Sequence, residues 1–234
     1  MRKFCTFFLV LLLGCNNAPQ EQSQSEVSTA EESIETDSSE YFDLSNFQQL
    51  VEKYEAPDRS EWQEPDFIIQ KLQPIEGRSI ADIGAGTGYF TFRLAEEGAS
   101  VIAIDIDERF LDYIETRKTE LLESIDPSQI ATRLSKENDP LLNEQEVDVA
   151  LLVNTYHFLT DRIEYLEKVK SGLQKGGKLV IVDYQTGQMP VGPPEKHKVA
   201  LEIAKEEIKK AGFEILEVDT KSLNYQYIIT AKQK

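Results

Sequence analysis

The chain is 234 residues long and 40% hydrophobic, and its 42 acidic and 25 basic side chains give a net charge of −17. A surface this acidic repels phosphate backbones and anionic lipid headgroups, so nucleic acid is not an expected partner. The length accommodates one domain of ordinary size after an N-terminal segment of different composition.

The N-terminal segment has the layout of a secretory signal peptide. Met1-Arg2-Lys3 is basic, residues 4–13 are almost wholly apolar, and the small residue Gly14 follows. A transmembrane helix needs about 20 apolar residues, and this run is shorter. We therefore expect residues 1–14 to be a signal peptide that directs export.

Cys15 follows the apolar run directly. The sequence "LLGC" at residues 12–15 resembles the lipobox of bacterial lipoproteins, which implies that diacylglycerol alkylates the Cys15 thiol and that cleavage makes Cys15 the new N-terminus. Cleavage removes Cys5 and two of the 25 basic residues, so the charge becomes −19 and no disulfide can form within the mature chain. A disulfide between chains stays open. We expect an exported protein held by lipid alone on the periplasmic or cell-surface side of a bacterial membrane.

Residues 16–40 are rich in Gln, Ser and Glu and contain no aromatic residue. Such a segment cannot bury enough apolar surface to offset the entropy lost on ordering. We expect a disordered acidic tether over 15–40 and a folded domain over 41–234.

The apolar periodicity of that domain predicts helices and strands that alternate. In chain order the predictions are a helix over 44–55, a helix over 65–72, a strand over 79–83, a helix over 87–97, a strand over 100–104, a helix over 108–124, a strand over 130–134, a strand over 148–153, a helix over 161–173, a strand over 178–183, a helix over 196–211, and strands over 214–218 and 225–230.

Continuous apolar strands separated by amphipathic helices indicate a parallel sheet that is covered on both faces. The closing two strands have no helix between them, so the last strand is expected to run antiparallel. The fold class predicted is α/β, a Rossmann-like three-layer sandwich with a mostly parallel seven-stranded sheet and an antiparallel last strand.

The strongest functional signal is "IADIGAGTGYF" at residues 80–90. Three alternating glycines join a strand to a helix, which permits a tight turn and brings a ligand close to the backbone and to the helix N-terminus. The dinucleotide pattern G-x-G-x-x-G requires glycine where this chain has Tyr89, which disfavours a dehydrogenase. The alternative is a glycine-rich turn that binds nothing.

This stretch resembles the first motif of class I S-adenosylmethionine-dependent methyltransferases. The segments "RSEWQEPD" (59–66), "VNTYHF", "LQKGGKLVIVD", "GPPEKHK", "AGFEI" and "LNYQY" extend the likeness to one bacterial subgroup over nearly all of residues 57–230. The resemblance implies the class I methyltransferase fold and S-adenosylmethionine as the cofactor. It also implies that Asp82 engages the amino end of the cofactor and that Gly84, Ala85, Gly86 and Gly88 pass beside it.

Further cofactor contacts are expected at the ends of the next two strands. An acid at the tip of the second strand can accept both ribose hydroxyls, and the resemblance assigns this role to Asp105 with Ile106 packing on the adenine. Asp107 is better explained as an N-cap. In "KENDPLL" the resemblance assigns Asn138 or Asp139 to the adenine amino group, although the same residues suit a plain turn.

The carboxyl ends of the fourth and fifth strands carry the candidates nearest to the acceptor. The resemblance places Asn154 at the cofactor. The candidate catalytic residues are Tyr156, His157 and Asp183. His157 could act as a base or orient the acceptor. A structural role for His157 and a capping role for Asp183 stay open. The long loop "QTGQMPVGPPEKH" is a candidate lid that could contribute His197. Relatives often have a second His where this chain has Phe158.

The function predicted is methyl transfer to a small-molecule acceptor by in-line displacement, for which the protein mainly supplies alignment. No H-x-x-E-H, H-E-x-x-H or C-x-x-C cluster is present, and no metal is expected. Because S-adenosylmethionine is made in the cytosol, an exported enzyme would depend on imported or leaked cofactor or would act before export. The alternative is a lipoprotein that binds or senses the cofactor, S-adenosylhomocysteine or a related nucleoside without catalysis. The identity of the acceptor and the oligomeric state are left open by the sequence.

Overall fold

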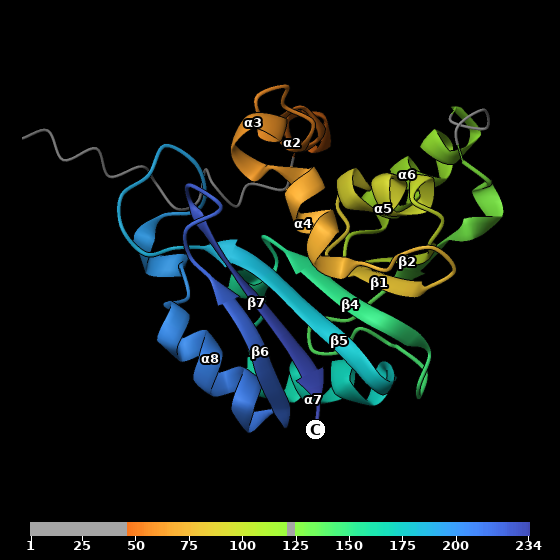
Figure 1. Cartoon of the computed structure of the whole chain (residues 1–234). Helices are drawn as coiled ribbons and strands as arrows, with labels where there is room; N and C mark the ends of the chain where they lie inside the picture. The colour runs from red at the N-terminus through yellow and green to blue at the C-terminus, as the bar shows by residue number, and fades with distance from the viewer. Residues whose placement is uncertain (1–45, 121–124) are drawn as a thin grey trace, which may run out of the picture. The chain divides into compact units, whose positions relative to one another are not determined.

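Seven strands form one sheet in the order β3-β2-β1-β4-β5-β7-β6 in the computed structural model, which describes residues 46–120 and 125–234 (Figure 1). The strands are β1 Ser79–Ile83, β2 Ser100–Asp105, β3 Ile130–Leu134, β4 Val147–Val153, β5 Leu173–Tyr184, β6 Phe213–Asp219 and β7 Gln226–Gln233. The first five pair in parallel, and β7 runs antiparallel to both β5 and β6. The predicted fold class is confirmed.

Helices cover both faces of this sheet. They are α2 Phe47–Tyr54, α3 Arg59–Gln63, α4 Pro65–Leu72, α5 Tyr89–Glu96, α6 Glu108–Glu120, α7 Arg162–Gly172 and α8 Leu201–Lys210, with short 3₁₀ turns at Pro127–Gln129, Tyr156–Phe158 and Glu195–His197. Helices α4, α5 and α6 pack on one face and α7 and α8 on the other. The three layers follow from this arrangement.

The central strands are apolar on both sides because each side faces a different core. In β5, Val180 and Val182 join the cluster under α4–α6, whereas Leu179 and Ile181 join the cluster under α7 and α8. This period of two is the expected pattern for a strand buried on both faces. It explains why these strands were the most predictable elements of the sequence.

Most observed boundaries differ from the prediction by a few residues, and four of the differences have a clear description. Helix α3 was not predicted, because five residues are too few for a periodic signal. Helix α5 begins at Tyr89 rather than residue 87, since Gly88 precedes it in the left-handed conformation (φ 81°). Helix α8 begins at Leu201 rather than residue 196, because the preceding Ala200 is extended (ψ 140°). Strand β5 begins five residues earlier than predicted, at Leu173.

The N-terminal helices lie at the edge of the sheet where the parallel strands end (Figure 1). Helix α2 begins at Phe47 because Asn46 caps it, its side chain accepting a hydrogen bond from the amide of Gln49. The predicted signal peptide, Cys15 and the tether to residue 40 lie outside the described residues, as do the ends of two predicted helices at 44–45 and 121–124. No helix in the described ranges is long and apolar enough to cross a membrane.

Candidate functional site

The glycine loop joins β1 to α5 at the carboxyl edge of the sheet. Gly84, Gly86 and Gly88 all have positive φ values, 75°, 53° and 81°. The amides of Gly84 and Ala85 donate to the carbonyl of Ile104 in the neighbouring strand β2, at 2.8 and 3.0 Å. The loop therefore turns tightly and stays anchored to the sheet, as the sequence predicted.

Two positions in this loop have no space for a side chain. A Cβ at Gly84 would lie 2.2 Å from Oγ1 of Thr155, and a Cβ at Gly88 would lie 2.7 Å from the ring of Phe92. At Gly86 a Cβ would lie 3.4 Å from the ring of Tyr54 in α2, which is an ordinary contact distance, so only the positive φ favours glycine there. Glycine is thus required at Gly84 and Gly88 by both conformation and space.

Asp82 ends β1 and is almost completely buried. It is 3% exposed, and its Oδ2 accepts a 2.6 Å hydrogen bond from Oγ1 of Thr91 in α5. Burial raises the pKa of Asp82 to about 6, although the hydrogen bond from Thr91 acts in the opposite direction. The carboxyl group lies directly beside the glycine loop, where the resemblance placed the amino end of the cofactor.

Asp105 ends β2 and holds the glycine loop in place. Its Oδ2 accepts from the amide of Gly86 at 2.8 Å and its Oδ1 from the amide of Asp107 at 3.0 Å. Each carboxylate oxygen keeps a second lone pair for a ribose hydroxyl. The next residue, Ile106, is 57% exposed and offers an apolar surface beside this carboxylate. Asp107 caps α6, as predicted, by accepting from the amide of Arg109.

Asn138 and Asp139 occupy a turn after β3. The side chain of Asp139 accepts from the amide of Leu141 at 2.8 Å, and the carbonyl of Asn138 accepts from Lys168 of α7. The Asp139 side chain thus stabilises the turn itself, which matches the alternative interpretation of this segment. Asn138 is exposed.

Asn154 belongs to a cluster of three amide side chains, here called the amide ring. Its Nδ2 donates to Oε1 of Gln63 at 3.0 Å, Gln63 Nε2 donates to Oε1 of Gln226 at 2.9 Å, and Gln226 Nε2 donates back to Oδ1 of Asn154. Gln63 and Gln226 are fully buried. The ring ties α3 to the ends of β4 and β7, so both ends of the Asn154 amide are engaged within the protein.

The structure does not support a catalytic role for Tyr156. Its side chain is fully buried, and its hydroxyl donates to Oε2 of Glu207 in α8 at 2.7 Å. Arg162 holds the same carboxylate at 2.8 and 2.9 Å. Burial and the hydrogen bond to Glu207 raise the pKa of Tyr156. The residue that follows a strand was expected to face the ligand, but the 3₁₀ turn rotates this one into the core.

His157 and Asp183 form a buried pair. Nδ1 of His157 lies 2.8 Å from Oδ1 of Asp183, whose Oδ2 accepts from the backbone amide of His157 at 2.9 Å. Both side chains are 1% exposed, and Nε2 of His157 is buried with no hydrogen-bond partner among the described residues. A buried ring nitrogen without a partner is costly, and it is available to a reacting group. Asp183 thus orients His157 rather than capping a loop.

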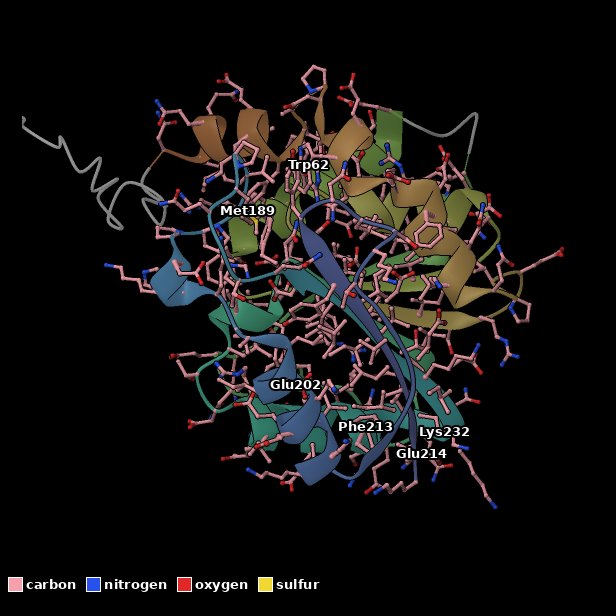
Figure 2. All side chains as sticks on the ribbon, turned by 60° about the vertical axis from the view of Figure 1, so that its left-hand side comes forward. Trp62, Met189, Glu202, Phe213, Glu214 and Lys232 are labelled. Atoms are coloured by element: carbon pink, nitrogen blue, oxygen red, sulfur yellow. The ribbon has the colours of Figure 1, made fainter. Side chains whose placement is uncertain are left out.

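The predicted lid loop contacts Tyr184, whose ring packs against His157. The Tyr184 ring packs edge-on to His157, with centroids 5.7 Å apart, and a Cβ at Gly192 of the loop would lie 2.6 Å from the same ring. Burial lowers the pKa of His197, and the charges of Lys196 and His157 add to this effect. In Figure 2, Met189 of this loop and Trp62 of α3 lie at the same end of the molecule, opposite Glu214 and Lys232.

Sequence analysis missed the contribution of α2 and α3 to this site. Glu55 accepts a hydrogen bond from Thr87 of the glycine loop and forms an ion pair with Arg117 at 3.4 Å. Arg59 lies over the ring of Tyr89, 4.0 Å from its centroid. The segment "RSEWQEPD" was noted only as part of the family resemblance, because its residues alone do not show that it lies beside the strand ends.

The glycine cradle, the two acids beside it and the order of the seven strands define a class I S-adenosylmethionine-dependent methyltransferase fold. Residues 81–179 match the methyltransferase domain family. The residues that would hold this cofactor are Asp82 and Asp105, whose carboxyl groups lie at the two strand ends beside the glycine loop. No group of three His, Cys, Asp or Glu side chains within the described ranges could hold a metal ion.

Similar proteins include methyltransferases, one of which is named for a tRNA acceptor. The chain is 28% identical over 124 residues to a tRNA U34 carboxymethyltransferase of Pseudoalteromonas translucida, covering 53% of this chain and 37% of that protein. It is 32% identical over 118 residues to an uncharacterised methyltransferase of Mycobacterium bovis, covering 50% and 44%. The chain therefore spans less than half the length of these relatives.

Solved structures share the fold over most of the chain. A S-adenosylmethionine-dependent methyltransferase from Aquifex aeolicus superposes with a TM-score of 0.73 at 23% identity, covering 81% of this chain and 99% of that one. The trans-methyltransferase CalH, in complex with S-adenosylhomocysteine, gives a TM-score of 0.58 at 22% identity, covering 73% and 55%. These similarities establish the fold.

Proposed function

We propose that this chain is an active S-adenosylmethionine-dependent methyltransferase whose acceptor is a small molecule that loses a proton on methylation. The observation that carries the proposal is the buried His157–Asp183 pair at the carboxyl edge of β4 and β5, with Nε2 of His157 left without a partner. Burying two titratable groups is costly unless they are used or fully hydrogen-bonded. A catalytic base accounts for this arrangement, and binding of the cofactor alone does not require it.

The pair is built to hold a histidine in one tautomer. When bound, S-adenosylmethionine supplies a methyl group on a positively charged sulfur. Asp183 is fixed by the backbone amides of His157 and Tyr184, at 2.9 and 2.7 Å, so its carboxylate favours the proton on Nδ1 of the ring. Nε2 is then the acceptor nitrogen, and it can take the proton that a hydroxyl or amine releases.

The strongly acidic chain favours a small acceptor over a nucleic acid. One relative is named a tRNA U34 carboxymethyltransferase, which makes tRNA the obvious competing acceptor. Binding of tRNA depends on basic side chains that neutralise phosphates. This chain has 42 acidic residues against 25 basic ones, so the electrostatic attraction is lacking.

The alternative is a lipoprotein that binds the cofactor or S-adenosylhomocysteine without turnover. The predicted export favours it, because S-adenosylmethionine is made in the cytosol. The two functions share the glycine cradle, Asp82 and Asp105, and they differ in the use of His157.

Calorimetry and single-turnover assays separate these functions. We expect the full chain to bind S-adenosylmethionine and S-adenosylhomocysteine but not NAD, and to methylate members of a panel of hydroxyl and amine compounds. His157→Gln should leave cofactor affinity unchanged and lower the methylation rate by about 10²-fold or more. Tyr156→Phe is the matched control, with an unchanged rate per folded molecule. Binding without turnover on any acceptor supports the alternative, and no binding contradicts both functions.

We also infer that the mature protein is anchored by a lipid on Cys15. The inference is supported by the position of this cysteine directly after the apolar run. Radiolabelled palmitate should label the wild-type chain but not Cys15→Ala. Equal labelling of the two would contradict the anchor and leave the methyltransferase proposal unaffected.

A further inference from the structure

The amide ring of Gln63, Asn154 and Gln226 is a closed hydrogen-bond network at the carboxyl edge of the sheet. Each of the three side chains donates one hydrogen bond to the next and accepts one from the side chain before it. Burying amides is costly unless they are hydrogen-bonded, and a fully connected network holds its members in one arrangement. Three apolar side chains would fill this space without that cost, so the ring is best explained by the directions that its hydrogen bonds impose.

The direction of the ring is fixed by Arg59. Nε of Arg59 donates to Oε1 of Gln63 at 3.2 Å, and a guanidinium can only donate. Oε1 must therefore face Arg59, so Nε2 of Gln63 faces Gln226 and the other two amides follow in the same sense. Nη1 of Arg59 donates to the carbonyl of Tyr54 at the end of α2, at 2.6 Å. The N-terminal helices thus specify how the Asn154 side chain is held.

Asn154 is the first residue of the turn that carries His157. Its φ of 58° is left-handed, which asparagine adopts more readily than most residues, and its amide donates to the carbonyl of Val182 in β5 at 2.8 Å. Thr155 follows beside the glycine loop, and the amide of His157 then donates to Asp183 at 2.9 Å. A change of backbone conformation at Asn154 would therefore displace the imidazole.

We infer that Gln63, Asn154 and Gln226 are positioning residues for His157. The ring holds Asn154 in its left-handed conformation, and this conformation directs the turn so that Nδ1 of His157 meets Asp183. The inference rests on the proposed function, which makes His157 the base. Its new element is that two buried glutamines, from α3 and the start of β7, act on the base through Asn154.

Asn154→Gly tests this role with little backbone strain, since glycine adopts a positive φ freely while the ring is broken. The assay is single turnover of the full chain with saturating S-adenosylmethionine and the hydroxyl or amine compound that is methylated fastest. We expect the rate per folded molecule to fall about 10-fold or more, because a small misplacement of a reacting group is costly. Gln226→Leu breaks the ring from the other side and should lower the rate similarly. Calorimetry should show unchanged cofactor affinity in both variants.

A double-mutant cycle separates positioning of the base from general damage to the fold. If the ring acts through His157, Asn154→Gly should have no further effect on the rate of a chain that already carries His157→Gln. A loss of the same size in both backgrounds would overturn the inference. An unchanged rate in both Asn154→Gly and Gln226→Leu would overturn it as well and would leave the proposed function standing.

Ser79→Ala is the matched control, because Ser79 joins β1 to β4 at the opposite edge of the sheet. Its hydroxyl donates to Oδ2 of Asp148 at 3.1 Å and accepts from the amide of the same residue at 3.2 Å. The substitution should lower the melting temperature but not the rate per folded molecule. A rate loss equal to that of Asn154→Gly would assign both losses to destabilisation and overturn the inference. A wild-type chain that methylates no acceptor would overturn the proposed function and this inference with it.

Discussion

At the scale of single residues, the buried charge of Asp82 lowers the stability of the folded protein at neutral pH. Burial raises its pKa from the ordinary 3.8 to about 6. Between these two values the folded chain retains a proton that the unfolded chain releases. The free energy of unfolding therefore falls as the pH rises from about 4 to about 6, and it stays lower above that range.

We predict that Asp82→Asn stabilises the ligand-free protein at neutral pH. Removing the buried charge should raise the free energy of unfolding at pH 7 by on the order of 2 kcal/mol and flatten its fall between pH 4 and 6. Urea unfolding at pH 4.5 and pH 7 measures both effects.

Asp107→Asn is the control, because the expected change in the free energy of unfolding at pH 7 has the opposite sign. The hydrogen bond from Arg109 lowers the pKa of Asp107, and this carboxylate caps α6. Asp107 stabilises the folded protein at pH values above the pKa that it has in the unfolded chain, and this contribution is lost as the pH falls through its lower folded pKa. Asp107→Asn should therefore destabilise the protein at pH 7. A loss of stability at pH 7 in Asp82→Asn as well would contradict the account of Asp82.

At the scale of elements, the turn from β1 to α5 is fixed by the contact of Gly84 with Thr155. The sequence predicted the turn because alternating glycines between an apolar strand and a helix are a local pattern. It did not predict Thr155 as the reason for Gly84, since this residue lies 71 positions along the chain in the turn after β4.

We predict that Gly84→Ala costs more stability than Gly77→Ala. The two glycines have nearly equal φ values, 75° and 73°, but a Cβ at Gly77 meets nothing within 4 Å. Gly77→Ala should cost only the left-handed strain, about 1–2 kcal/mol. Gly84→Ala should cost about 2 kcal/mol more, because Thr155 must move. Urea unfolding checks both variants, and equal losses would show that Thr155 adjusts freely.

The same difference between local and distant signals explains what the sequence analysis missed. The strands β1, β2, β4 and β5 were predictable because each is a continuous apolar run. The amide ring was not, because Gln63, Asn154 and Gln226 are distant in sequence and each looks like an ordinary polar residue. His157 and Asp183 were singled out separately as residues after neighbouring strands, but only the structure shows them paired.

At the scale of the whole molecule, the acidic surface restricts the acceptor more than the fold does. Methyltransferases of this fold include relatives named for tRNA, so the architecture alone leaves nucleic acid open. The net charge of −17 argues against it because no release of counterions would accompany binding.

We predict that the full chain does not bind tRNA at about 150 mM salt. Fluorescence anisotropy with labelled tRNA should show no saturable change up to micromolar protein, while S-adenosylhomocysteine raises the melting temperature of the same sample. Saturable binding that weakens steeply with added salt would reveal a basic surface that the total charge conceals, and would return tRNA to the candidate acceptors.

The contact between the loop after β5 and Tyr184 bears on which step of the proposed reaction limits its rate. Gly192 rests on the ring of Tyr184, which packs edge-on to His157, and Nε2 of His157 is buried in this state. Under the proposed function, we expect the loop to lift before an acceptor reaches that nitrogen and to lift again before the product leaves. Each catalytic cycle would then contain two diffusive movements through solvent, which can be slower than the transfer of the methyl group. A turnover rate that falls in proportion to solvent viscosity is the signature of such a gate.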